Sequence, residues 1–138
     1  MRCINFDKEF ERFMMAYVKE HGKEYKNYDA IEAAMPDIYA LFLDTPANWL
    51  GGKKPGEYFD QFDNARQLVN WMEDYIKQRI PVPDMLMNRI SEMGKEAEDA
   101  LMNLLRKERA PREAVMQAMT LLREIESTAP MAYYIDLQ

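Results

Sequence analysis

Apolar residues recur every three or four positions along most of the chain, which is the spacing of amphipathic α-helices. The first such stripe predicts a helix that ends at Gly22, with Asn5 or Asp7 able to cap its start. The apolar members of this stripe are Phe6, Phe10, Phe13, Met14, Tyr17 and Val18.

The next stripe predicts a helix that begins at Asp29, with Glu32 three residues later as in a capping box. Pro36 interrupts this stripe, because it lacks a backbone donor and disfavours helical geometry at Met35. The helix is therefore either kinked or broken at that point. We favour a break, with Pro36 in the first turn of a helix that ends near Leu43.

The remaining helices are marked by residues typical of helix ends. Asp63 is expected to cap a helix whose apolar stripe runs to Ile80. Three further helices follow, and the residues that open or close them are Pro81, Pro83, Gly94 and Pro111. Residues 131–138 are ambiguous and fit either a short docked turn or a tail.

No segment alternates polar and apolar residues as a strand does, so we expect an all-α chain. Short connections predict about six helices in packed antiparallel hairpins. The length of 138 residues and the 48% hydrophobic content fit a single domain over residues 1–138. Aromatic residues concentrate in residues 1–80, whereas residues 81–130 carry mainly Leu, Met, Ile and Ala, which predicts two subclusters in one core.

Residues 82–125 resemble HEAT-like helical repeats. The resemblance lies in small residues that let helices approach and in leucines that fill the space between them: Gly94, Ala97, Leu101 and Leu105 in one helix, and Arg112, Ala114, Ala118 and Leu122 in the next. The family commonly has an Asp five residues before that arginine, where this chain has Lys107, with Glu108 as the nearest acid. The resemblance implies a small stack of helix pairs, with C-terminal pairs that are HEAT-repeat-like, and a role in protein–protein interaction.

Residues 44–62 contain two prolines and three glycines, which predicts a loop with about one helical turn. The loop is also rich in aromatic residues, and aromatic rings beside glycines and positive charge are common at interfaces. The best candidate for a partner-binding surface therefore consists of Trp49, Leu50, Lys53, Lys54, Tyr58 and Phe59. The alternative is that Trp49 simply pins the loop to the core.

The net charge is −6 at pH 7 and is spread evenly along the chain. A nucleic-acid partner would need a basic face, and the densest basic cluster, at residues 106–112, is interrupted by Glu108. No apolar run is long enough to span a membrane, and the N-terminus lacks the pattern of a signal peptide. We expect a cytoplasmic protein without a nucleic-acid or membrane partner.

Residues able to support catalysis are few. His21 is the only histidine, and in the last turn of its helix it is expected to interact with the helix carbonyls. Cys3 is the only cysteine and has no histidine near it in the sequence, which fits an inert thiol. The glycines of the 44–62 loop do not match a phosphate-binding motif. We expect no catalytic residue, no cofactor and no metal, and we expect the twelve methionines mainly to fill the core.

These features predict a non-catalytic protein–protein interaction module or small scaffold. The alternative is a small-ligand-binding protein or an enzyme that uses the aromatic N-terminal part and the 44–59 loop. An enclosed pocket with converging polar groups would favour this alternative, whereas an exposed apolar patch would favour the interaction module.

Overall fold

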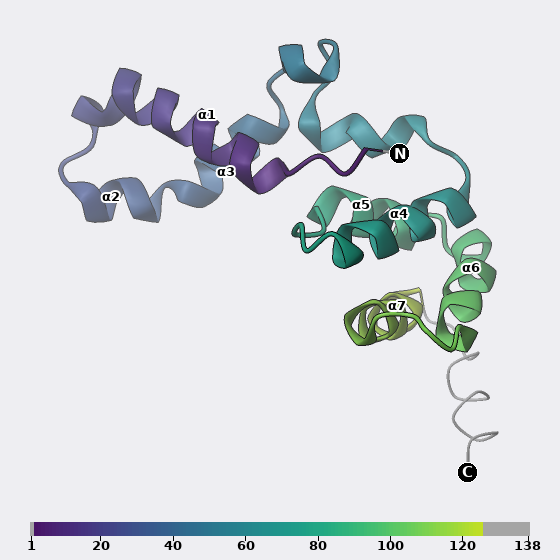
Figure 1. Cartoon of the computed structure of the whole chain (residues 1–138). Coiled ribbons are helices and arrows are strands. Elements are labelled where there is room, and N and C mark those ends of the chain that lie inside the picture. The colour runs from purple at the N-terminus through teal and green to yellow at the C-terminus, as the bar shows by residue number, and fades with distance from the viewer. Residues whose placement is uncertain (1, 126–138) are drawn as a thin grey trace. The chain divides into compact units, whose positions relative to one another are not determined.

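The computed structural model describes residues 2–125, which form seven α-helices and three 3₁₀ segments (Figure 1). These residues form no strand, and their β-type pairing is limited to an isolated bridge between Ala47 and Lys53. The prediction of an all-α chain is thus confirmed for residues 2–125, although the α-helices number seven rather than about six.

The chain divides into two compact units. The first spans Ile4–Tyr58, and its helices are α1 (Phe6–His21), α2 (Tyr28–Ala33) and α3 (Met35–Leu43). The second combines Met1–Cys3 with Phe59–Gln138, and its helices are α4 (Ala65–Lys77), α5 (Asp84–Glu92), α6 (Lys95–Arg106) and α7 (Arg112–Glu124). A single domain over residues 1–138 stays a prediction. Residues 131–138, expected as a turn or a tail, lie outside the described residues.

The helix starts in the α1–α3 unit are set by asparagine side chains. Asn5 caps α1 by accepting a hydrogen bond from the backbone N–H of Lys8 at 3.1 Å. Asn27 caps α2 in the same way through the N–H of Ala30 at 2.9 Å, so the predicted start at Asp29 is wrong by two residues. Asp29 lies instead in the first turn of α2, where a negative charge favours the helix N-terminus.

Pro36 occupies the first turn of α3, as predicted. Helix α2 ends at Ala33 and α3 begins at Met35, so Ala34 is the single residue between them. A proline is tolerated there because the first N–H groups of a helix have no partner within the helix. The break therefore turns one amphipathic stripe into two short helices.

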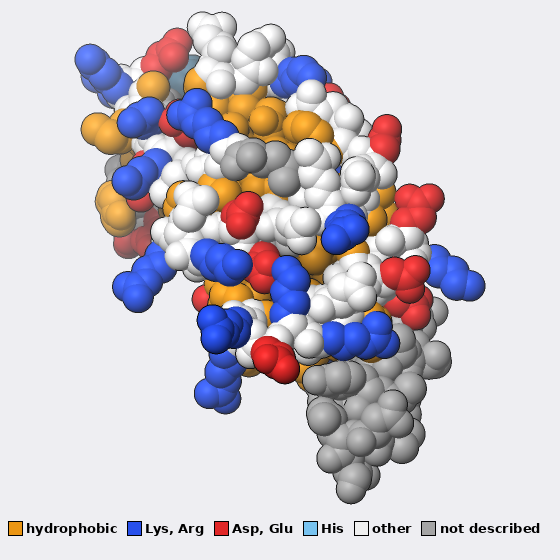
Figure 2. All heavy atoms as spheres, turned by 45° about the vertical axis from the view of Figure 1, so that its right-hand side comes forward, with side chains coloured by type: hydrophobic (Ala, Val, Ile, Leu, Met, Phe, Trp, Pro, Cys, Tyr) orange, Lys and Arg blue, Asp and Glu red, His pale blue; other side chains and the backbone are white. Residues whose placement is uncertain are grey.

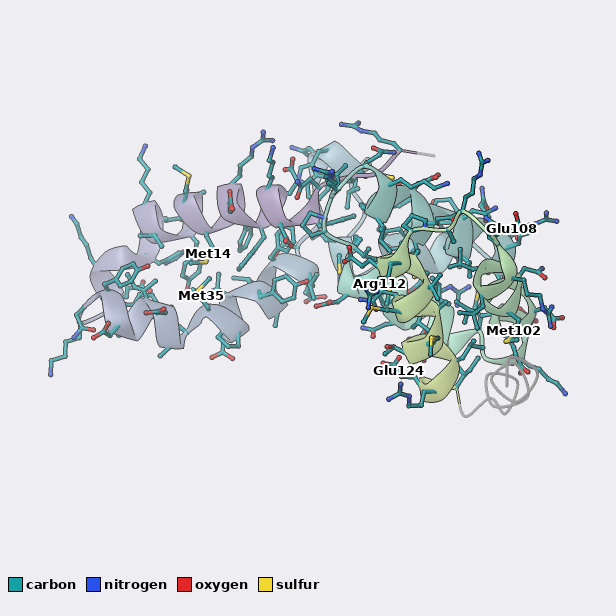
Figure 3. All side chains as sticks on the ribbon, turned by 60° about the horizontal axis from the view of Figure 1, so that its bottom comes forward. Met14, Met35, Met102, Glu108, Arg112 and Glu124 are labelled. Carbon is teal, nitrogen blue, oxygen red and sulfur yellow. The ribbon has the colours of Figure 1, made fainter. Side chains whose placement is uncertain are left out.

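Aromatic rings supply most of the packing in the α1–α3 unit. The ring of Phe42 on α3 lies 5.4 Å from the rings of both Phe10 and Phe13 on α1, measured between centroids. Met14 on α1 and Met35 on α3 face each other between these helices (Figure 3). Few hydrophobic side chains of the unit are buried, and they are Phe6, Ile38, Phe42, Leu50 and Pro55.

Burial is much more extensive in the α4–α7 unit, where α4 packs against α5, α6 and α7. Seven of the thirteen residues of α4 are buried: Ala65, Leu68, Val69, Trp71, Met72, Glu73 and Tyr75. Glu73 is the single buried charged residue between positions 2 and 125, and its carboxylate accepts a hydrogen bond from Lys107 at 2.8 Å. Lys107 precedes α7 by five residues, so this ion pair joins α4 to the α6–α7 connection.

Both ends of α4 differ from the prediction. Asn64, rather than Asp63, caps the start by accepting from the N–H of Gln67 at 3.0 Å. At the other end, α4 stops at Lys77 instead of continuing to Ile80, because Arg79 adopts a left-handed backbone conformation with φ +59°. The N–H of Ile80 then donates to the carbonyl of Tyr75, and the N–H of Arg79 donates to the carbonyl of Ile76. These two bonds are the Schellman pattern of helix ends.

The boundaries of the last three helices follow the predicted signals. Pro83 and Pro111 directly precede α5 and α7, and Gly94 separates α5 from α6. Gly94 has φ +56° and ψ −121°, a backbone region open essentially to glycine alone. The methionines are divided between interior and surface: Met72, Met85 and Met102 are buried, whereas Met15, Met35 and Met116 are exposed. The expectation that they mainly fill the core therefore holds for only some of them.

Emptying the core of the α4–α7 unit tests this packing. Leu101 and Leu122 have no exposed surface, so Leu101→Ala and Leu122→Ala should each lower the free energy of unfolding by about 2–5 kcal/mol in chemical denaturation. Met116→Ala on the exposed side of α7 is the matched control and should cost less than about 0.5 kcal/mol. Losses below about 0.5 kcal/mol at both leucines would show that the core lies elsewhere.

The strained backbone at the end of α4 gives a second test, in which the substitution should stabilise the protein instead of destabilising it. Arg79→Gly should raise the free energy of unfolding by about 0.5 kcal/mol, because glycine adopts the left-handed conformation without the clash that an L-side chain makes. Asn70→Gly, within the regular part of α4, should instead lower it by a few tenths of a kcal/mol. Destabilisation by Arg79→Gly would mean that contacts of the arginine side chain outweigh the backbone strain.

Candidate functional site: the Trp49 cleft

The loop after α3 is closed by short backbone contacts. A 3₁₀ turn, Asn48–Leu50, ends at Gly51, and Gly51 and Gly52 both have positive φ, at +67° and +87°. The N–H of Gly52 then reaches the carbonyl of Ala47 at 2.8 Å, and the N–H of Ala47 reaches the carbonyl of Lys53 at 3.1 Å. These bonds fold residues 47–53 into a tight loop that presents Trp49.

The loop is also fixed where it returns toward α3. A Cβ atom placed on Gly56 would lie 3.0 Å from the backbone oxygen of Leu43, so only glycine permits this close approach. Lys54 donates to Asp44 at 2.9 Å, and this hydrogen bond and the charge of Asp44 raise the pKa of the Lys54 ammonium. Both contacts join the end of α3 to the segment that follows the loop.

Trp49 packs on its own unit and remains accessible. Its ring lies 5.7 Å from that of Phe6 in an edge-to-face arrangement and 6.4 Å from that of Phe42 in a nearly parallel one. The residue nevertheless keeps 39% of its surface exposed. The sequence left open whether Trp49 pins the loop or lies on the surface. In the structure its ring does both, since it packs on Phe6 and Phe42 and also remains partly exposed.

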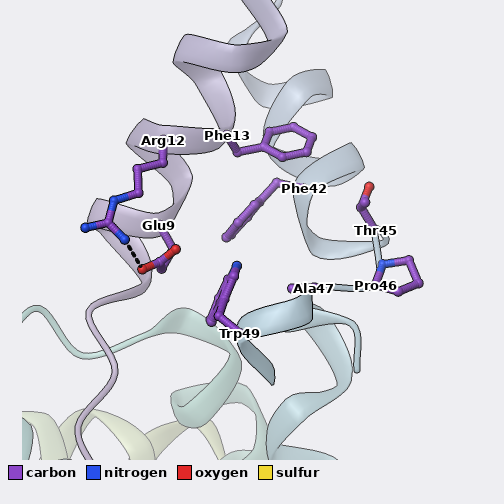
Figure 4. Close-up of a pocket in the computed structure, with 8 residues that line it drawn as sticks. All are labelled: Glu9, Arg12, Phe13, Phe42, Thr45, Pro46, Ala47 and Trp49. Atoms are coloured by element: carbon purple, nitrogen blue, oxygen red, sulfur yellow. Dashed lines mark hydrogen bonds and ion pairs between the residues drawn. The ribbon is translucent and has the colours of Figure 1, made fainter. Parts of the chain in front are cut away.

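Beside Trp49 lies an open cleft of about 410 Å³ (Figure 4). Helix α1 contributes one wall and the end of α3 with the following loop contributes the other; the lining residues are Glu9, Arg12, Phe13, Phe42, Thr45, Pro46, Ala47 and Trp49. Glu9 and Arg12 form an ion pair at 2.9 Å, in which the Glu9 side chain is 19% exposed and the Arg12 side chain 74%. The cleft thus has aromatic walls and a charge pair beside them.

The six residues predicted as a partner-binding surface do not share one environment. Trp49 and Lys53 are exposed, Lys54 is paired with Asp44, and Leu50 is buried. The ring of Tyr58 packs at 6.0 Å from that of Phe6. Phe59 is buried in the other unit, where its ring lies 5.0 Å from that of Trp71.

The cleft includes residues that the sequence did not single out as a site. Phe13 and Phe42 belong to the predicted apolar stripes of their helices, and Glu9 and Arg12 lie one turn apart on α1. Their periodicity placed them in helices, but nothing in it indicated that these helices would converge beside Trp49.

Within residues 2–125, no group of three or more His, Cys, Asp or Glu side chains could hold a metal ion. His21 is the last residue of α1, with Nδ1 3.4 Å from the carboxylate of Glu24 and its ring 4.8 Å from that of Tyr17. On the face shown in Figure 2, basic and acidic side chains are interspersed.

Cys3 lies against α4 in its own unit. The side chain of Gln78 approaches the Cys3 sulfur at 3.5 Å, and the indole N–H of Trp71 donates to the backbone oxygen of Arg2 at 3.0 Å. Burial raises the pKa of the Cys3 thiol, and the negative charge of Asp74 raises it further.

Comparison with known proteins adds no family. The chain matches no protein-family model, and the searches found no matching curated protein or solved structure. Among the described residues, no helix has both the length and the apolar character needed to cross a membrane.

The environment of Cys3 predicts slow alkylation. At pH 8 the thiol should react with iodoacetamide more slowly than free cysteine does, because its raised pKa keeps it protonated and the thiolate is the nucleophile. Asp74→Asn removes a negative charge and should speed the reaction, as followed by intact-protein mass spectrometry. Equal rates for the two proteins would show that Asp74 does not act on the thiol.

Proposed function

We propose that this protein is a non-catalytic interaction module in which the Trp49 cleft takes an apolar side chain from a partner protein. The main support is the combination of an accessible indole ring with an open cleft in the α1–α3 unit. Large rings that are partly packed in place and partly exposed are frequent energetic centres of protein interfaces. The loop that carries Trp49 is closed by its own hydrogen bonds, so little ordering would be needed on binding.

The alternative partner is a small molecule. A cleft of about 410 Å³ is within the range of small-ligand pockets, but such pockets usually enclose most of their ligand. Here the Arg12 side chain is largely exposed and Pro46 and Trp49 are exposed, so a ligand would remain open to water on one side. This geometry suits a side chain that arrives on a larger partner.

The HEAT-like character of the C-terminal helices is part of the same proposal. Support comes from small residues at buried helix contacts, since Ala97, Ala114 and Ala118 have no exposed surface and α6 packs against α7. Lys107, at the position where the family commonly has Asp, binds Glu73 instead, while Glu108 and Arg112 lie in the turn and at the start of α7 (Figure 3). In this proposal the α4–α7 unit is a stable scaffold within a cytoplasmic interaction protein.

A photo-crosslinker at position 49 tests the proposed site. Replacing Trp49 with benzoylphenylalanine keeps an aromatic side chain in the loop and should yield covalent adducts with a defined protein partner from host lysate. The matched control carries the same group at Tyr28, an exposed aromatic residue of the same unit that does not line the cleft. Ala47→Arg, which places a long charged side chain on the cleft wall, should reduce partner recovery at least tenfold with little change in melting temperature.

Two outcomes would contradict the proposal. Equal adducts from positions 28 and 49 would mean that the cleft has no special role. A small molecule retained in native mass spectrometry of the wild-type protein, and lost with Ala47→Arg, would favour the ligand-binding alternative.

A further inference from the structure

A second exposed feature lies on α1 and is separate from the cleft. Met15 keeps 74% of its surface exposed near the middle of this helix. Together with Met14, Val18 and Lys19 it borders a shallow, almost wholly apolar hollow of about 490 Å³. A large flexible apolar side chain beside an apolar hollow is unusual for a solvated helix face and suits contact with another surface.

The charges on either side of Met15 have opposite signs. Glu11 lies four residues before it and Lys19 four residues after it, so the three side chains share one face of α1. Both charged residues are exposed, and neither belongs to an ion pair with another described residue. On this face Glu11 therefore places a negative charge on one side of Met15, and Lys19 places a positive charge on the other.

We infer that this face binds a second copy of the same chain, with the two α1 helices antiparallel around a two-fold axis at Met15. In that arrangement Glu11 of each copy faces Lys19 of the other, and this pairing occurs twice because two-fold interfaces repeat every contact. The paired positions are eight residues, about 12 Å, apart along the helix. Each Met15 side chain enters the apolar hollow of the opposite copy.

The other charges on α1 fit this orientation. Arg12, next to the same face, is held by Glu9 at 2.9 Å. Lys8 falls opposite Gly22 of the second copy, where no side chain opposes it. A parallel arrangement would instead place Glu11 against Glu11 and Lys19 against Lys19, and both contacts repel.

Sedimentation equilibrium of charge variants tests the pairing. The contact is small, so we expect a weak dimer with a dissociation constant on the order of 100 µM that weakens at high salt. Glu11→Lys and Lys19→Glu should each weaken dimerisation at least tenfold, because each puts like charges across the axis twice. Both changes in one chain should restore it, and mixing the two single variants should give heterodimers.

Disulfide trapping tests the orientation. In a Cys3→Ser background, Met15→Cys should form an intermolecular disulfide rapidly, because position 15 meets itself at the axis. Ala16→Cys is the control, since it is also exposed but points about 100° away around the helix. The proposal would be overturned by a monomer at all concentrations up to about 1 mM, by a double variant that stays as weak as the single ones, or by equal crosslinking at positions 15 and 16.

Discussion

Glu73 brings a negative charge into the interior of the α4–α7 unit, where its side chain keeps only 5% of its exposure. A buried carboxylate without a partner is costly, so the charge of Glu73 needs a nearby cation. The ammonium of Lys107 lies 2.8 Å from this carboxylate, and the ammonium of Lys77 lies 3.8 Å from it. Because Lys107 follows α6 and Glu73 lies in the middle of α4, this pair fixes the α6–α7 connection against α4. The helices α5, α6 and α7 all pack against α4 in this unit, so the pair lies beside the aliphatic core.

The α1–α3 unit has no comparable centre. Helix α1 buries only Phe6, and α2 buries no side chain. The other rings and the methionines of these two helices therefore remain partly accessible. Folding such a unit leaves apolar surface near Trp49 and Met15 that other molecules can cover. This contrast between a well-buried unit and a sparsely buried one is why we propose interaction surfaces on the α1–α3 unit.

Local rules predicted the parts of this fold that depend on neighbouring residues. Pro36, Pro83, Gly94 and Pro111 mark helix ends as expected, because backbone geometry at proline and glycine is set within a turn. Contacts between distant residues were beyond such rules. The Glu73–Lys107 pair joins positions 34 residues apart, and the cleft requires α1 and α3 to meet beside Trp49. For the same reason composition could not show that Leu50 and Phe59 are buried while Trp49 stays accessible.

Hydrogen exchange of the native protein, resolved by residue, measures this contrast in burial most directly. Amides in the middle of α4 and α6 should exchange only through global unfolding, whereas those of α1 and α2 should open locally and exchange at least tenfold faster. The comparison requires dilute protein, so that self-association does not protect α1. Uniform protection across all seven helices would contradict the view that the α1–α3 unit is sparsely packed and left accessible for binding.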